Sequence, residues 1–133
     1  MLSSSRASAL RHYRSSGSAA AICDVSQHHV IVMLYNGALE SLGRAQAAMK
    51  SGDTKARLKS VRSATEVLGY LRGILNLKAG GKVAASLAEL YDYMIVRLTR
   101  ANAMNDAEGL NEVSRLICEI KAGWEAIPQD KRY

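Results

Sequence analysis

The residues that could hold a metal or a cofactor are few and poorly spaced for that chemistry. His28 and His29 are neighbours, and adjacent side chains on a helix point about 100° apart, so the two cannot share a metal ion. The sequence has no Glu-x-x-His pair of the di-iron type and no Cys-x-x-Cys-His haem site. Cys23 and Cys118 could form one disulfide, but two reduced, partly buried thiols are expected in a cytosolic protein. We therefore expect no metal and no cofactor.

A second candidate for chemistry is the segment Ala-Gly-Gly-Lys-Val at 79–83, which superficially resembles a phosphate-binding loop. Such a loop requires glycine where this chain has Asn76, and serine or threonine where it has Val83. The acidic residues are scattered singly, and none is paired with a nucleophile. The sequence therefore predicts a binding protein and not an enzyme.

The elements that would position any binding residues are helices. The chain has 133 residues, enough for one domain with one core, and its single proline, Pro128, leaves long helices possible upstream. Apolar residues recur at spacings of three and four in four segments, which predicts helices over residues 27–49, 54–77, 82–104 and 107–127.

Turn and cap residues separate these segments. Ser26 is the predicted N-cap of the first helix and Asp53 that of the second, while Asn105-Asp106 predicts a turn and a cap before the fourth. Gly80-Gly81 is the predicted C-terminal stop of the second helix. Because the connections are short, neighbouring helices must run antiparallel, so we expect an all-α, up-down-up-down four-helix bundle over residues 27–128.

The ends of the chain differ from this bundle. Of residues 1–26, 14 are Ser, Ala or Gly, which predicts a flexible N-terminal arm. Tyr13 is the one large aromatic residue in that arm and the candidate to anchor it. Residues 129–133 form a predicted C-terminal tail.

Charge and hydropathy limit the environment of the protein. The formal net charge is +6, and residues 50–82, with eight basic and two acidic residues, account for all of it. A basic helix can bind an acidic partner or nucleic acid, or be a solvated face. The longest apolar run, residues 30–35, is too short to cross a bilayer. No secretory signal is evident either, so we expect a cytoplasmic protein without stable membrane insertion.

The second helix has more apolar residues than a bundle core needs. Beside its core stripe, a second line lies about 100–120° around the axis. Further apolar residues lie off the core faces of the first and third helices. Three covers are possible: the chain's own arm, a second copy, or a client segment. Alternatively these positions only widen the core. The residues concerned are Val67, Tyr70, Ile74, Leu77, Val32, Leu39, Tyr93 and Val96.

Several blocks resemble one protein family. Residues 26–39, Ser-Gln-His-His-Val-Ile-Val-Met-Leu-Tyr-Asn-Gly-Ala-Leu, are similar to the signature S-P-H-Q-L-I-x-M-L-Y-D-G-A-L of the FliS flagellar secretion chaperones. Gly-Gly at 80–81 and the block Leu-Ala-Glu-Leu-Tyr-Asp-Tyr-Met at 87–94 resemble its central segment, and Trp124 follows in the family's order. Gln27 and Asn36 depart from the signature, and Ser16 replaces an apolar residue in the arm.

The resemblance implies an antiparallel helical bundle in the cytosol of a flagellated bacterium. It would bind the disordered C-terminal segment of flagellin, prevent premature polymerisation and deliver flagellin to the flagellar type III export apparatus. Export-gate components are possible further partners, and a monomer or weak dimer is expected. The stripes and the resemblance together predict that the partner contacts Tyr13, Val32, Tyr35, Leu39, Val67, Tyr70, Leu71, Ile74, Leu77, Tyr93 and Val96.

Two other functions compete with this interpretation. A basic bundle could bind nucleic acid through Lys55, Lys59 and Arg62, although no row of aromatic residues interleaves them. A structural homodimer could instead bury the additional apolar face. Salt dependence distinguishes nucleic-acid binding from client binding, because binding to phosphates weakens steeply with salt and binding in an apolar groove does not.

Overall fold

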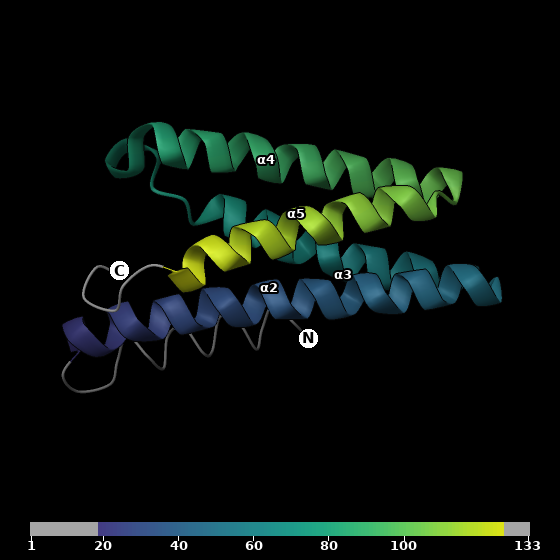
Figure 1. The fold of residues 1–133 in the computed structure, drawn as a ribbon, viewed down its shortest axis with the longest axis horizontal. Coiled ribbons are helices and arrows are strands. Elements are labelled where there is room, and N and C mark those ends of the chain that lie inside the picture. Colours follow the sequence, from purple (N-terminus) through teal and green to yellow (C-terminus); the bar gives the residue numbers. More distant parts are fainter. Residues whose placement is uncertain (1–18, 127–133) are drawn as a thin grey trace.

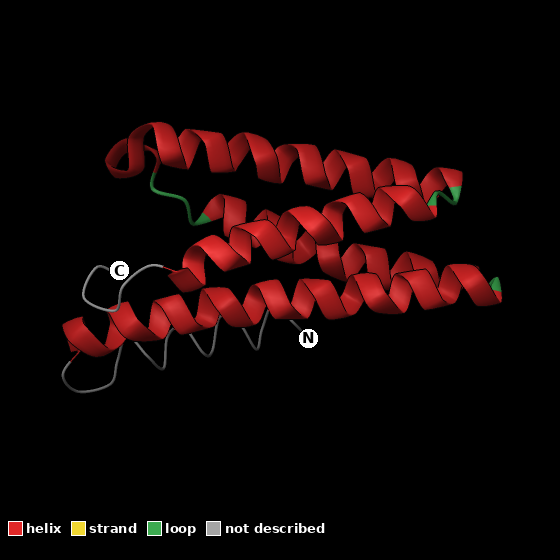
Figure 2. Ribbon diagram, in the orientation of Figure 1, coloured by secondary structure: helices red, strands yellow, loops and turns green. Residues whose placement is uncertain are grey.

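The computed structural model describes residues 19–126, and the side chains of residues 28–77 and 80–126 (Figure 1). Four helices make up this part of the chain, and Figure 2 shows only short connections and no strand between residues 19 and 126. Successive helices run in opposite directions, so the predicted all-α, up-down-up-down bundle is confirmed. The helices are α2 (Ala19–Ser51), α3 (Thr54–Gly73), α4 (Leu77–Met104) and α5 (Ala107–Ala126).

Each helix packs mainly against two neighbours, in the closed order α2–α3–α4–α5 and back to α2. The apolar residues that recur at spacings of three and four supply most of the core. They are joined there by residues from adjacent positions, because a helix with two neighbours buries a broad face. The largest fully buried side chains are Tyr35, Leu42, Val67, Leu68, Tyr91, Met94, Leu98, Leu110, Val113 and Ile117.

Two connections use the same local chemistry. Gly52 and Asn105 have positive φ angles of 73° and 54°, the left-handed conformation that commonly follows a helix C-terminus. The aspartate after each one caps the next helix: the Asp53 carboxylate accepts from the amide of Ala56 at 3.0 Å, and Asp106 accepts from the amide of Glu108 at 3.0 Å. Both predicted caps are confirmed.

The connection between α3 and α4 differs from the prediction. The second helix does not run to Leu77; it ends at Gly73, with Ile74 as its C-cap, and Leu77 is the first residue of α4. Gly80-Gly81 is therefore not the stop of the second helix. Gly81 instead kinks the start of α4, with φ 56° and ψ −132°, a conformation that residues with a Cβ avoid. The apolar spacing continues across the break, which is why the pattern concealed it.

The start of the first helix also differs from the prediction. The helix begins at Ala19 and not at Gln27, so Ser26 lies inside it and is not its N-cap. No glycine or proline interrupts residues 19–27, and alanine, the strongest helix former, occupies 19–21. Residues 1–18 of the predicted arm, including Tyr13, and the predicted tail at 129–133 lie outside the described residues.

Candidate functional site

Eight large apolar side chains remain exposed among the described residues, and five of them gather in two places. Ile74, Leu77 and Val83 lie where α3 meets α4, and we call this the α3–α4 corner. Tyr93 and Val96 lie three residues apart on α4, away from its buried stripe. Apolar clusters of this kind on a soluble protein mark surfaces that contact other molecules.

The two glycines shape the α3–α4 corner. A Cβ on Gly80 would lie 2.6 Å from the Cβ of Ala84, and Gly81 has its positive φ. Ile74 is the C-cap of α3 and Leu77 is the first residue of α4, before the kink, and each keeps 47% of its surface exposed. Val83 follows directly after the kink and is more exposed still. The corner is therefore an exposed apolar surface at the junction of the two helices.

Three of the residues predicted to contact a partner belong to the core. Val67 and Leu71 are 1% and 2% exposed, and Tyr35 is fully buried. The prediction that Val67 lies off the core face is wrong, because α3 packs against both α2 and α4 and buries both flanks of its inner side. None of the three can touch a partner in this conformation.

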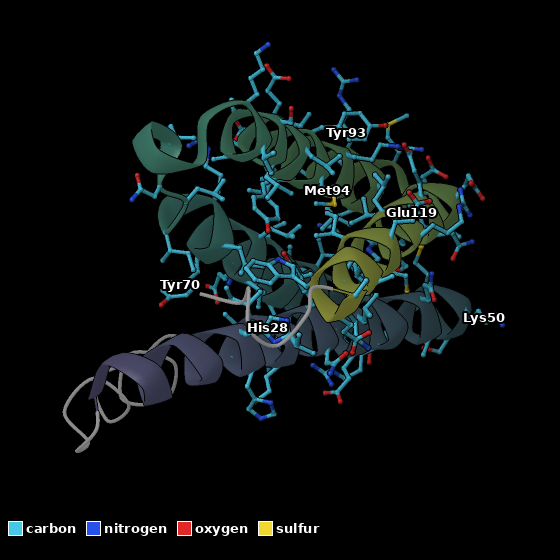
Figure 3. All side chains as sticks on the ribbon, turned by 60° about the vertical axis from the view of Figure 1, so that its left-hand side comes forward. His28, Lys50, Tyr70, Tyr93, Met94 and Glu119 are labelled. Carbon is cyan, nitrogen blue, oxygen red and sulfur yellow. The ribbon has the colours of Figure 1, made fainter. Side chains whose placement is uncertain are left out.

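Val32, Leu39 and Tyr70 have intermediate exposure, and Leu39 and Tyr70 pack against the core. Gln46 on α2 hydrogen-bonds Asn111 on α5, so this side of α2 faces α5. Leu39 and Val32 lie 7 and 14 residues before Gln46, which places both on the same side of the helix. Tyr70 belongs to α3. Figure 3 shows Tyr70 and Tyr93 on widely separated parts of the bundle. The predicted residues thus do not form one continuous floor.

On the outer side of α4, the hydroxyl of Tyr93 donates to the Glu112 carboxylate on α5. Arg97 donates to the same carboxylate at 2.7 Å and also to Asp106. The hydrogen bond to Glu112 raises the pKa of Tyr93, and the hydrogen bonds from Tyr93 and Arg97 lower the pKa of Glu112. This network fixes the tip of Tyr93 while its ring stays half-exposed beside Val96.

Inside the bundle, three side chains from three helices form a hydrogen-bonded chain. Trp124 Nε1 on α5 donates to the hydroxyl of Tyr35 on α2 at 2.9 Å, and that hydroxyl lies 2.7 Å from the hydroxyl of Tyr91 on α4. We call Trp124, Tyr35 and Tyr91 the buried hydrogen-bond chain. His28 Nε2 donates to the Trp124 carbonyl at 2.8 Å, and its ring meets the indole edge-on, which ties the end of α5 to α2.

The buried hydrogen-bond chain holds the bundle together and does not suit acid–base chemistry. Burial raises the pKa of both Tyr35 and Tyr91, so both hydroxyls stay neutral at physiological pH. The hydrogen-bonded chain was not predicted from the sequence, because Tyr91 and Trp124 entered there only as part of the family resemblance. The signal available was that a buried Tyr or Trp needs a polar partner.

No other chemistry emerges from the described side chains. Among them, no group of three or more His, Cys, Asp or Glu could hold a metal ion. Cys118 is exposed and unpaired within this set, not partly buried as predicted. No helix in residues 19–126 combines the length and hydrophobicity needed to span a membrane.

Comparison with known proteins identifies the family. The sequence model described as "Flagellar protein FliS" matches residues 9–131. The chain belongs to the FliS family. The flagellar secretion chaperone FliSB of Pseudomonas aeruginosa is 37% identical over 119 residues, covering 90% of this chain and 94% of the relative. The flagellar secretion chaperone FliS of Salmonella typhimurium is 36% identical over 122 residues, covering 91% and 90%.

Membership in the FliS family confirms the resemblance drawn from the motifs. It places the chain among flagellar secretion chaperones, a family of binding proteins and not of enzymes. The Leu-Tyr-Asp-Tyr-Met block of the FliS resemblance occupies both sides of α4: Tyr91 and Met94 lie in the core, and Tyr93 faces outward. The motif thus combines packing residues with an exposed aromatic residue.

Proposed function

We propose that this FliS-family chain is an export chaperone for flagellin and binds its disordered C-terminal segment. The observation that carries the proposal is the set of large apolar side chains left in water at the α3–α4 corner and on the outer side of α4. The bundle core is complete without them, so their burial is available to a partner.

The arrangement of these residues favours a client that wraps around the bundle. Ile74 and Leu77 lie at the corner, Tyr93 and Val96 lie further along α4, and Val32 and Leu39 lie on the α5-facing side of α2. A single short helix cannot cover surfaces on different sides. A long disordered segment can, and the apolar area it buries offsets the entropy lost when it orders.

In the cytosol, a flagellin whose C-terminal segment is covered in this way cannot add to a filament prematurely. The complex then delivers flagellin to the flagellar type III export apparatus, where export-gate components are further partners. The chaperone acts as a monomer or a weak dimer. Tyr13 and the segment before α2 compete with the client in this scheme, so deleting residues 1–18 leaves flagellin affinity unchanged or tighter.

Calorimetry with full-length flagellin, and with flagellin lacking its C-terminal segment, tests the proposal. Only the full-length protein is expected to bind, with a large negative heat-capacity change and weak salt dependence. Equal binding of the truncated flagellin would contradict the assignment of the client segment.

A matched pair of variants locates the surface. Ile74→Asp places a charge at the α3–α4 corner and should weaken flagellin binding at least about 30-fold, because a carboxylate loses its hydration there. Leu58→Asp is the control, since Leu58 is also on α3 and similarly exposed, at 44%, but lies far from the corner. Both variants should melt close to the wild type. Unchanged affinity of Ile74→Asp would place the client elsewhere.

A further inference from the structure

Asp92, Glu108 and Glu112 on α4 and α5 have arginine partners, whereas Lys55, Lys59 and Arg62 on α3 are in no ion pair among the described side chains. Every ion pair among the described side chains uses arginine, and none uses lysine. Arginine offers a rigid fork that suits a partner in a fixed position, while lysine is a hydrated point charge on a flexible stem. The ion pairs are Arg72–Asp92, Arg97–Asp106, Arg97–Glu112 and Arg115–Glu108.

The unpaired cations form one row. Lys55, Lys59 and Arg62 are exposed and recur at spacings of four and three, so they share the side of α3 opposite its buried residues, and the exposed Glu66 ends the row one turn beyond Arg62. Leu58 lies among them and is 44% exposed. We call Lys55, Leu58, Lys59 and Arg62 the basic face. Arg57 is not part of it, because its guanidinium is held by Asn102 and Asn105 at the α4–α5 turn.

The composition of the basic face selects among anionic partners. Helix α3 contains no Asn or Gln to read base edges, and its one aromatic residue, Tyr70, packs against the core. The face therefore has no aromatic platform on which bases could stack and no amide side chain to read adenine. An apolar residue surrounded by cations suits a phospholipid surface, where the cations meet headgroup phosphates and the leucine reaches the acyl boundary.

The position of the face fits the same partner. Lys55 and Arg62 lie about 10 Å apart along the axis of a regular helix, at 1.5 Å per residue. The helix lies lengthwise along the bundle, so the row can approach a plane side-on without any unfolding (Figure 1). We propose that the basic face binds peripherally to anionic phospholipid membranes. This interaction is separate from the flagellin surface, because Lys55 and Lys59 lie at the opposite end of α3 from the α3–α4 corner.

Flotation of the full chain with vesicles tests the proposal. The protein is expected to float with vesicles of equimolar phosphatidylglycerol and phosphatidylcholine at low ionic strength, and not with phosphatidylcholine alone. Added salt should release it, because exposed charges are screened. Each charge near an anionic surface contributes a factor of about five, so Lys55→Gln combined with Lys59→Gln should lower the partition coefficient roughly 25-fold.

The matched control removes two lysines elsewhere. Lys82→Gln combined with Lys121→Gln makes the same change in net charge, but Lys82 follows the kink of α4 and Lys121 lies in the last two turns of α5, both distant from the basic face. This variant should float nearly as well as the wild type. Equal losses in both double variants would overturn the proposal, because net charge alone would then explain binding.

Two further measurements keep the outcomes distinct. Leu58→Ser should reduce flotation with vesicles and leave any retention on duplex DNA unchanged. If the wild-type chain bound DNA and did not bind vesicles, the lipid assignment would be overturned in favour of nucleic acid. Flagellin binding should survive Lys55→Gln with Lys59→Gln. The two proposals therefore fail independently, since each surface has its own variant and its own ligand.

Discussion

Replacing Tyr35 with phenylalanine removes one hydroxyl but breaks both links of the buried hydrogen-bond chain. In the variant, the Trp124 N–H loses its acceptor and the Tyr91 hydroxyl loses its partner. A buried polar group without a partner costs about 1–3 kcal/mol, so Tyr35→Phe should lower the free energy of unfolding by about 3 kcal/mol. Tyr91→Phe leaves only the Tyr35 O–H unpaired and should cost about 1.5 kcal/mol.

The double variant gives the decisive comparison. With both hydroxyls gone, only the Trp124 N–H remains unpaired, so the double variant should cost no more than Tyr35→Phe alone. The double variant therefore loses less free energy of unfolding than the two single variants together, by more than about 1 kcal/mol, as expected for coupled residues. Urea denaturation followed by far-UV circular dichroism measures all four proteins, provided that the slope of the transition stays constant. Additive losses would refute the interpretation that these groups form one hydrogen-bonded unit.

Three further predictions concern stability. Ile117→Ala, at a fully buried position, should cost about 2–5 kcal/mol on denaturation, and a near-neutral result would contradict its place in the core. Gly109→Ala should lower the melting temperature, because the new Cβ would lie 2.6 Å from the Cβ of Ala101; an unchanged melting temperature would contradict this close approach of α4 and α5. Alkaline titration should destabilise the bundle. The pKa values of Tyr35 and Tyr91 are raised in the folded protein, whereas tyrosines in the unfolded chain ionise at about pH 10. Below that pH both states are neutral and the bundle keeps its full stability. Above it the unfolded state ionises first, so the free energy of unfolding falls as the pH rises. Denaturation from neutral pH upward should show this loss, and the variant lacking both hydroxyls should lose less.

Local signals in the sequence determined the fold class. Apolar residues at spacings of three and four identify a helix wherever it packs, so the stripe of α5 through Leu110, Val113 and Ile117 was predictable and is fully buried. The turns at 52–53 and 105–106 were equally predictable, because a residue that tolerates positive φ and a capping aspartate act within a few residues of each other. The family motifs are also properties of the sequence alone.

Helix boundaries depended on more than the pattern. The apolar line through Val67, Tyr70, Ile74 and Leu77 suggested one long helix, although the chain turns after Gly73. Periodicity records which side of an axis a residue occupies and not where the axis ends. The kink at Gly81 depends on backbone angles that two adjacent glycines permit but do not require.

Only the tertiary structure decided which apolar residues are core and which are surface. Val67 and Ile74 share the predicted stripe, yet one is buried and the other half-exposed, because Val67 lies inside α3, which packs against α2 and α4, whereas Ile74 is the C-cap at the end of the helix. The buried hydrogen-bond chain likewise joins residues that are 56 and 89 positions apart in the sequence. Helical spacing fixes the direction of a side chain about its own axis, but burial and long-range hydrogen bonds depend on where the other helices lie.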